Sequence, residues 1–264
     1  MSIEHHKKNH QKKMTKTYFI TGANRGIGLS IAKQLAADPD VEVIATARNP
    51  ASATDLQELA KSNSRVKLVQ LDVSDEDSIE KAGAEVAKLT DSIDVFISNG
   101  AIGRSYASVL ETSKEQWVDH YNTNALGPVL LLKQIYPLIK KGTEKKIIFV
   151  STMAASLGLT LPVNFSAYGQ SKAALNYTVK DLSKELREDG SIVIAVHPGV
   201  VSTDMNKAAA QFMSERNPAA GELLALNERI TSDKSAEDLL DLFEGLTEES
   251  NGKFFSYDKS EIPW

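Results

Sequence analysis

Short apolar runs alternate with longer segments of helical spacing along most of the chain. The apolar runs predict strands at 18–20, 41–47, 66–71, 93–98, 147–150, 192–196 and 253–257. Apolar residues three and four positions apart predict helices at 27–35, 55–61, 74–89, 115–140, 167–186 and 236–246. This alternation predicts a single α/β domain, a doubly wound parallel sheet of about seven strands with helices on both faces.

Local signals refine the boundaries of these elements. Ser52 and Asp55 are spaced like a capping box, and Ser74 is placed to cap the helix at 74–89. Pro128 lies inside the long helical region and should kink it or end a turn. The stretch 198–233 has no clear period, so we expect it to be irregular and to hold the substrate-binding segment.

Composition limits the possible functions. The chain contains no cysteine, which excludes disulfides, thiol catalysis and thiolate metal sites. Its net charge of -5 argues against wrapping nucleic acid, and its apolar stretches are too short to span a bilayer. We therefore expect a soluble protein, and the absence of cysteine is compatible with the cytoplasmic location that we predict.

Residues 1–15 differ in composition from the remainder. This stretch is basic and histidine-rich, without an apolar core for secretion or an arginine typical of transit peptides. His5, His6 and His10 could bind a metal ion, but we expect a disordered, solvated tail and no metal site. The folded domain is then expected to span 16–264.

A glycine-rich turn follows the first predicted strand. Gly22, Gly26 and Gly28 stand where a side chain would block a tight turn, the approach of backbone to a pyrophosphate, or helix–strand packing. The N-terminus of the following helix offers free N–H donors and partial positive charge. We interpret this turn as a dinucleotide site.

Tyr168 and Lys172 form the sharpest chemical signal. Four residues apart on a predicted helix, they share one face, so the ammonium can lie near the phenol and near a cofactor ribose. A free tyrosine has a pKa of about 10, and a fixed cation nearby stabilises the phenolate. Such pairs also occur by chance on solvated helices, but this helix follows a strand that ends in Ser151 and Thr152.

An ordered set of motifs resembles the short-chain dehydrogenase/reductase family over 17–257. The motifs are TGANRGIG at 21–28, LDV at 71–73, SNGA at 98–101, NTNALGP at 122–128, ST at 151–152, YGQSK at 168–172 and PGVVST at 198–203. The run HPGVVSTDM and the ending GKFFSYD with EIPW are most similar to norsolorinic acid ketoreductase-like and sniffer-like carbonyl reductases. The resemblance implies a Rossmann-type fold and reduction of a ketone or aldehyde with NAD(P)H.

The resemblance also implies roles for particular residues. Tyr168 would protonate the carbonyl oxygen, while Lys172 would hold the nicotinamide ribose and lower the pKa of Tyr168. Asn124 would hold a water next to Lys172, and bonding backbone at a helix irregularity near Pro128 is compatible with that role.

The residue whose hydroxyl would hydrogen bond the substrate carbonyl differs from the family pattern. Family members usually carry a second serine at this strand end, and this chain has Thr152 there. A threonine hydroxyl can donate the same hydrogen bond, although its methyl group stiffens and crowds the site. We favour Thr152, with Ser151 as an alternative donor and Ser156 as a further one.

The family pattern assigns cofactor contacts to the ends of several strands. The residues at matching positions are Gly22, Asn24, Arg25, Gly26, Ile27, Gly28, Arg48, Asp72, Val73, Asn99, Gly100, Tyr168, Lys172, Pro198, Gly199, Val201 and Thr203. The order of SNGA differs from the usual NNAG, which affects local backbone geometry rather than the fold. His197 is expected to be packed structure.

Charge favours NADP(H) over NAD(H). Folds that take NAD place an acid roughly 20 residues beyond the glycines, on the ribose 2′-hydroxyl. Arg48 stands there instead, preceded by Ala47, so no carboxylate repels a 2′-phosphate. Arg48 can pair with that phosphate or stack on adenine, and Arg25 is a second candidate.

The residues around the expected site predict an apolar or aromatic carbonyl substrate. Met153, Leu157, Leu159, Leu161, Phe165, Met205, Phe212 and Met213 could line its pocket. An alternative is an NADPH-binding sensor or scaffold without turnover, and an epimerase or dehydratase would require a longer chain. The helices at 115–140 and 167–186 could pair between copies in a homodimer.

Overall fold

The computed structural model describes residues 15–105, 107–161, 164–216 and 229–264. Nearly all of the predicted tail at 1–15, including His5, His6 and His10, lies outside the described residues. Within the described ranges, no helix combines the length and apolar character needed to span a bilayer.

Seven parallel strands form one sheet in the order β3-β2-β1-β4-β5-β6-β7. The strands are β1 (Lys16–Ile20), β2 (Val41–Ala47), β3 (Val66–Gln70), β4 (Val95–Ser98), β5 (Lys146–Val150), β6 (Ile192–His197) and β7 (Phe254–Ser256). The strand order reverses between β1 and β4, where doubly wound sheets bind ligands beyond the carboxyl ends of their strands. The predicted parallel α/β sheet and its number of strands are confirmed.

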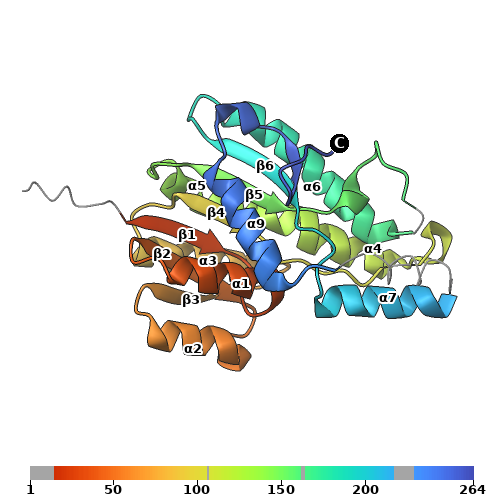
Figure 1. Cartoon of the computed structure of the whole chain (residues 1–264), viewed down its shortest axis with the longest axis horizontal. Coiled ribbons are helices and arrows are strands. Elements are labelled where there is room, and N and C mark those ends of the chain that lie inside the picture. The colour runs from red at the N-terminus through yellow and green to blue at the C-terminus, as the bar shows by residue number, and fades with distance from the viewer. Residues whose placement is uncertain (1–14, 106, 162–163, 217–228) are drawn as a thin grey trace, which may run out of the picture.

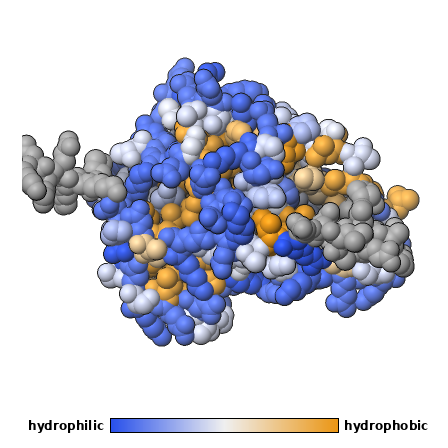
Figure 2. Space-filling model, viewed as in Figure 1, coloured by the Kyte–Doolittle hydropathy of each residue, from blue (hydrophilic) through white to orange (hydrophobic). Residues whose placement is uncertain are grey.

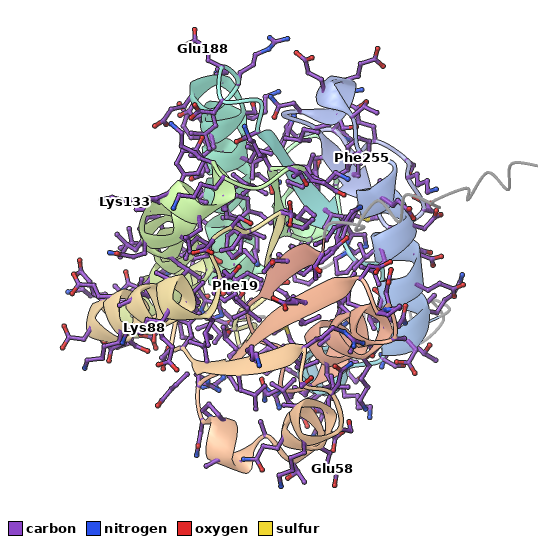
Figure 3. All side chains as sticks on the ribbon, turned by 90° about the vertical axis from the view of Figure 1, so that its left-hand side faces the viewer. Phe19, Glu58, Lys88, Lys133, Glu188 and Phe255 are labelled. Carbon is purple, nitrogen blue, oxygen red and sulfur yellow. The ribbon has the colours of Figure 1, made fainter. Side chains whose placement is uncertain are left out.

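Helices cover both faces of the sheet (Figure 1). One face packs against α1 (Gly26–Ala36), α2 (Thr54–Ser62) and α9 (Ser232–Glu244), and the other against α3 (Glu76–Leu89), α5 (Gly127–Ile139) and α6 (Ser166–Glu185). Phe19 of β1 lies inside the molecule, whereas Lys133 of α5 and Glu58 of α2 point outward (Figure 3). Nearly continuous apolar strands are required because both sheet faces are covered.

The long helix predicted at 115–140 is interrupted. It consists of α4 (Lys114–Tyr121), the π-helical turn η3 (Asn122–Leu126) and α5, which begins at Gly127. Pro128 occupies the first turn of α5, directly after the π-helical turn, so the predicted break near Pro128 is confirmed.

Two predicted caps are wrong. Asn49 caps the short helix η1 (Pro50–Ser52) by accepting from Ala51 N–H, and α2 begins without a side-chain cap. Asp75 caps α3 by accepting from Ser78 N–H, whereas Ser74 hydrogen bonds Asp72 instead. Asp75 therefore takes the place predicted for Ser74, because α3 begins one residue later than expected, whereas no described side chain caps α2.

The stretch 198–233 is not irregular throughout, as α7 (Asp204–Arg216) shows. Thr203 begins this helix as a cap, since its Oγ1 accepts from Asn206 N–H at 3.3 Å. Residues 217–228 of this stretch lie outside the described residues. Weak amphipathic spacing hid α7 from the sequence pattern, although the Thr203–Asp204 pair is a typical helix start.

Candidate active site

A cavity of about 770 Å³ opens beyond the carboxyl ends of the strands. Most predicted cofactor residues line it: Gly22, Asn24, Arg25, Gly26, Ile27, Arg48, Asp72, Val73, Asn99, Gly100, Pro198, Gly199, Val201 and Thr203. Ser151, Thr152, Tyr168 and Lys172 line the same cavity. Gly28 and Asn124 are predicted site residues that lie behind the lining. The fold thus brings residues as far apart in sequence as Gly22 and Thr203 to one edge of the sheet.

The glycine turn requires glycine for two different reasons. Gly22 and Gly26 adopt φ values of +66° and +56°, which side chains disfavour. A Cβ on Gly22 would lie 2.7 Å from Gly100 Cα, and one on Gly28 would lie 2.4 Å from Gly22 O. Gly28 therefore acts through packing of α1 against the turn.

Asn99 holds the turn from the neighbouring strand. Its Nδ2 donates to the carbonyl oxygens of Thr21 and Gly22, both at 3.1 Å. Thr21 Oγ1 accepts in return from the N–H groups of Asn99 and Gly100, at 3.0 and 2.9 Å. These bonds join β1 to β4 at the point where the strand order reverses.

The turn and the first turn of α1 fit a dinucleotide diphosphate. Arg25 is the N-cap residue of α1, and its side chain makes no capping hydrogen bond. The backbone N–H groups that follow are therefore available as anion donors beside Gly26 and Ile27, which line the cavity. A bound NAD(P)H would be held here.

Tyr168 and Lys172 lie on one face of α6 beside the end of β5. The Lys172 Nζ donates to Val150 O at 2.7 Å, and Lys172 is buried, whereas Tyr168 is half-buried at the cavity lining. Thr152 hydrogen bonds the Tyr168 hydroxyl, while Thr152 Oγ1 accepts from Ala154 N–H at 3.3 Å. Since that oxygen already accepts, the Thr152 hydrogen is available to the phenol oxygen.

Burial sets the pKa values of this pair. It raises the pKa of Tyr168 to about 12, against a smaller lowering by the Thr152 hydrogen bond. Burial also lowers the pKa of Lys172 from its ordinary value of 10.5 to about 7, because a low dielectric disfavours the ammonium. Burial outweighs the lowering influence on Tyr168, so its pKa is raised and not lowered as the resemblance implied.

The other candidate hydroxyl groups bond elsewhere. Ser151 Oγ donates to Asn176 Oδ1 at 2.6 Å, and Ser156 Oγ donates to Pro263 O at 2.5 Å. Neither hydroxyl forms a described hydrogen bond with Tyr168. Among the three candidates, the structure brings Thr152 to the phenol.

Asn124 is fully buried in the π-helical turn. Its Oδ1 accepts from Ile102 N–H at 2.9 Å, and its Nδ2 donates to Ile102 O at 2.8 Å and Ser171 Oγ at 3.0 Å. The side chain therefore bonds backbone at a helix irregularity, the alternative that the sequence had suggested. It fixes Ile102, which lines the cavity.

Two arginines lie at the end of the cavity where the adenosine of a dinucleotide would bind, and they differ in their ion pairs. Arg25 Nη1 lies 3.4 Å from Asp204 Oδ2 in an exposed ion pair, whereas Arg48 is exposed and has no ion pair with a described residue. Asp72 Oδ1 accepts from the Ser74 hydroxyl at 2.7 Å. Ala47 is buried at the end of β2. Arg48 is thus the cation most available to a ligand at this end.

Half of the predicted apolar lining is present. Met153, Leu161, Phe165 and Met205 line the cavity. Leu159 instead packs against the core, Leu157 is 89% exposed, and Phe212 is not part of the lining. The side chain of Met213 lies outside the described residues.

Several lining residues were not predicted from sequence. Thr46, Ile102 and Asn206 line the cavity, and Asn206 Nδ2 donates to Val201 O at 2.7 Å. Sequence patterns give Thr46 no distinct signal because it sits inside an apolar strand. His197, predicted to be packed structure, is buried but also lines the cavity, and its Nδ1 has no hydrogen-bond partner.

Similarity to known proteins agrees with this geometry. Residues 16–214 match the family model described as short chain dehydrogenase. An uncharacterized oxidoreductase of Schizosaccharomyces pombe is 46% identical over 94% of this chain and 98% of its own length. The short-chain dehydrogenase srdF of Neurospora crassa is 35% identical over 93% and 96%.

Two solved structures share the fold. The NADPH-bound carbonyl reductase from chicken fatty liver has a TM-score of 0.84 and 30% identity, covering 95% of each chain. The carbonyl reductase Sniffer of Drosophila melanogaster has a TM-score of 0.82 and 28% identity, covering 95% of this chain and 100% of its own.

The chain therefore belongs to the short chain dehydrogenase family. It is an oxidoreductase of the compact, carbonyl reductase type, which confirms the resemblance found in its sequence.

The buried Lys172 should make stability depend on pH. The folded state holds this proton less tightly than the unfolded chain, so the contribution of Lys172 is least favourable below pH 7 and improves as pH rises toward 10.5. We expect the unfolding free energy of the wild type, relative to Lys172→Met, to rise by about 1 to 3 kcal/mol between pH 7.5 and 9.5. Urea titrations at several pH values measure it. A constant difference would contradict the lowered pKa.

Proposed function

We propose that the protein reduces a ketone or aldehyde with NADPH by hydride transfer, with Tyr168 as the general acid. One observation carries the proposal. The Tyr168 hydroxyl, hydrogen bonded by Thr152 and accompanied by Lys172, lines the same cavity as a glycine turn shaped for a diphosphate.

The environment of Tyr168 keeps its proton in place. A pKa of about 12 means that the phenol is protonated at neutral pH, as a general acid must be, but it is a weaker acid than a free tyrosine, so donation to a carbonyl oxygen depends on stabilising the phenolate. The Thr152 hydroxyl then stabilises the phenolate that remains. The nicotinamide supplies the hydride when it is bound.

Lys172 can replace the donated proton. Its pKa of about 7 means that the amine exchanges protons readily near neutral pH, while the bond to Val150 O fixes its position. Asn124 supports this path only indirectly, since its side-chain amide is occupied by Ile102 and Ser171. A water bound near Lys172 would have to use other groups, such as backbone carbonyls of the π-helical turn.

The preference for NADPH is supported by Arg48. Its exposed guanidinium lines the cavity at the end of β2, where the buried Ala47 provides no carboxylate. A guanidinium binds a phosphate by paired hydrogen bonds. The similar carbonyl reductase from chicken fatty liver is described as NADPH-bound.

An apolar or aromatic substrate is supported by Met153, Leu161, Phe165 and Met205, which line the cavity. Hydrophobic surface also appears where α4 and the loop before α6 lie (Figure 2), and Leu110 and Leu157 are almost fully exposed. The predicted homodimer and cytoplasmic location stay predictions. A sensor or scaffold without turnover is the outcome that the first experiment below distinguishes.

Tyr168→Phe removes the proposed proton donor and little else. We expect the rate of NADPH oxidation with a panel of ketones and aldehydes to fall by on the order of 10² to 10⁴. The dissociation constant for NADPH, measured by fluorescence, should change less than about threefold because phenylalanine keeps the ring. No turnover by the wild type, with tight NADPH binding in both proteins, would favour the sensor.

Arg48→Glu should shift the cofactor preference toward NADH. Charge reversal at a partly exposed site changes phosphate binding by about 1 to 3 kcal/mol, so kcat/KM for NADPH should fall by about 10- to 100-fold while that for NADH falls little. Arg187→Glu is a matched control, since Arg187 is an exposed arginine outside the cavity lining. Equal losses with both cofactors would contradict the assignment.

The apolar lining should appear as a difference in kcat/KM between carbonyl compounds. We expect aromatic ketones to exceed small polar aldehydes by about tenfold or more, because each buried methylene contributes about 0.8 kcal/mol. Met205→Ser should reduce that ratio, since Met205 lines the cavity. Equal rates with small polar aldehydes would contradict an apolar site.

A further inference from the structure

The mechanism leaves one buried histidine beside Tyr168 unused. His120 lies in the last turn of α4, with only 2% of its surface exposed. Its ring meets the Tyr168 ring edge-on, with centroids 6.5 Å apart and planes at 76°. Helix α4 packs on α6, so this contact belongs to the interface between the two helices (Figure 1).

The hydrogen bonds of His120 determine its protonation. Nδ1 lies 2.7 Å from Gln116 O, and Nε2 accepts from Arg104 N–H at 3.1 Å. A carbonyl oxygen can only accept and a backbone N–H can only donate, so the ring is neutral with its hydrogen on Nδ1. Both ring nitrogens are thus used, which fixes the orientation of the ring.

Through Arg104, His120 holds the segment 102–105, which begins in the cavity wall at Ile102. Ala101 and Ile102 line the cavity, and Arg104 follows two residues later. Asn124 holds Ile102 through two backbone hydrogen bonds.

Hydroxyl groups anchor the next part of the same segment. Ser105 Oγ lies 2.7 Å from Ser166 Oγ in the first turn of α6, and Thr112 Oγ1 lies 2.9 Å from Ser166 Oγ. Ser105 is fully buried. Side chains of α4, η3 and α6 therefore hold the segment 102–105 in place. Of these side chains, His120 also contacts the ring of Tyr168.

We propose that His120 is a positioning residue, which fixes the Tyr168 ring and the segment 102–105 relative to each other. The proposal rests on the proposed function of Tyr168. Errors of about 1 Å in the placement of reacting groups can reduce a rate by about 100-fold, so a contact that fixes both groups affects turnover. His120 touches neither the cavity nor the reacting atoms.

Protonation of His120 should loosen this arrangement. An imidazolium would place a second N–H against Arg104 N–H, and burial lowers the pKa of His120, which keeps the neutral form in the folded protein. The charged groups that face it are Asp119 on α4, which opposes this lowering, and Arg104 in the segment 102–105, which reinforces it. From α6 the ring faces the phenol of Tyr168. Activity should therefore decline only at a pH more acid than that at which a free histidine becomes protonated.

Substitutions separate the two contacts. His120→Phe keeps an aromatic ring against Tyr168 but removes both hydrogen bonds, whereas His120→Gln can keep an acceptor for Arg104 N–H and removes the ring. We expect His120→Phe to lower kcat for ketone reduction by about 10- to 100-fold with less than about a threefold change in the KM for NADPH. His120→Gln should recover part of that kcat. Lys114→Gln, at the exposed start of α4 and away from His120, is the matched control.

The pH profile and melting temperature distinguish positioning from simple stability. The acid decline in kcat of the wild type should be absent in His120→Phe, and a lower melting temperature alone would not remove it. If wild type turns over and folded His120→Phe and His120→Gln both keep kcat within about twofold, the inference is overturned. If no carbonyl compound is reduced by the wild type, the proposed function fails instead.

Discussion

The close approach of the first turn to the neighbouring strand is the constraint on which the site depends. A Cβ on Gly22 would lie 2.7 Å from Gly100 Cα, and Asn99 joins the two backbones by hydrogen bonds at 3.1 Å. This contact closes the floor of the cavity where the strand order reverses. It leaves the N-terminus of α1 open to a diphosphate, and it sets the distance from there to the residues on β5 and α6.

The reactive groups on the opposite side are held by burial rather than by mutual attraction. Lys172 donates to Val150 O at 2.7 Å, and its burial lowers its pKa to about 7, while burial raises that of Tyr168 to about 12. A protonated phenol and an amine that exchanges protons near neutral pH suit reduction of a carbonyl. A buried amine of this kind reduces stability at neutral pH. Such perturbed pKa values are common at functional sites.

Much of the fold followed from the sequence because its strands are short, apolar and separated by helices of regular period. The caps at Asn49 and Asp75 and the helix α7 were missed, since each depends on competition between neighbouring acceptors or on weak periodicity. For the site, motif order located the cavity residues, but sequence alone could not choose among Thr152, Ser151 and Ser156. That choice depended on Asn176 and Pro263, which bind the two serines from distant parts of the chain.

The most direct test of this arrangement is a crystal structure of the protein with NADPH bound. We expect the diphosphate on the backbone between Gly22 and Gly28, the 2′-phosphate at Arg48, and the nicotinamide ring facing the Tyr168 hydroxyl. A nicotinamide bound away from Tyr168, or a diphosphate held outside the glycine turn, would contradict it.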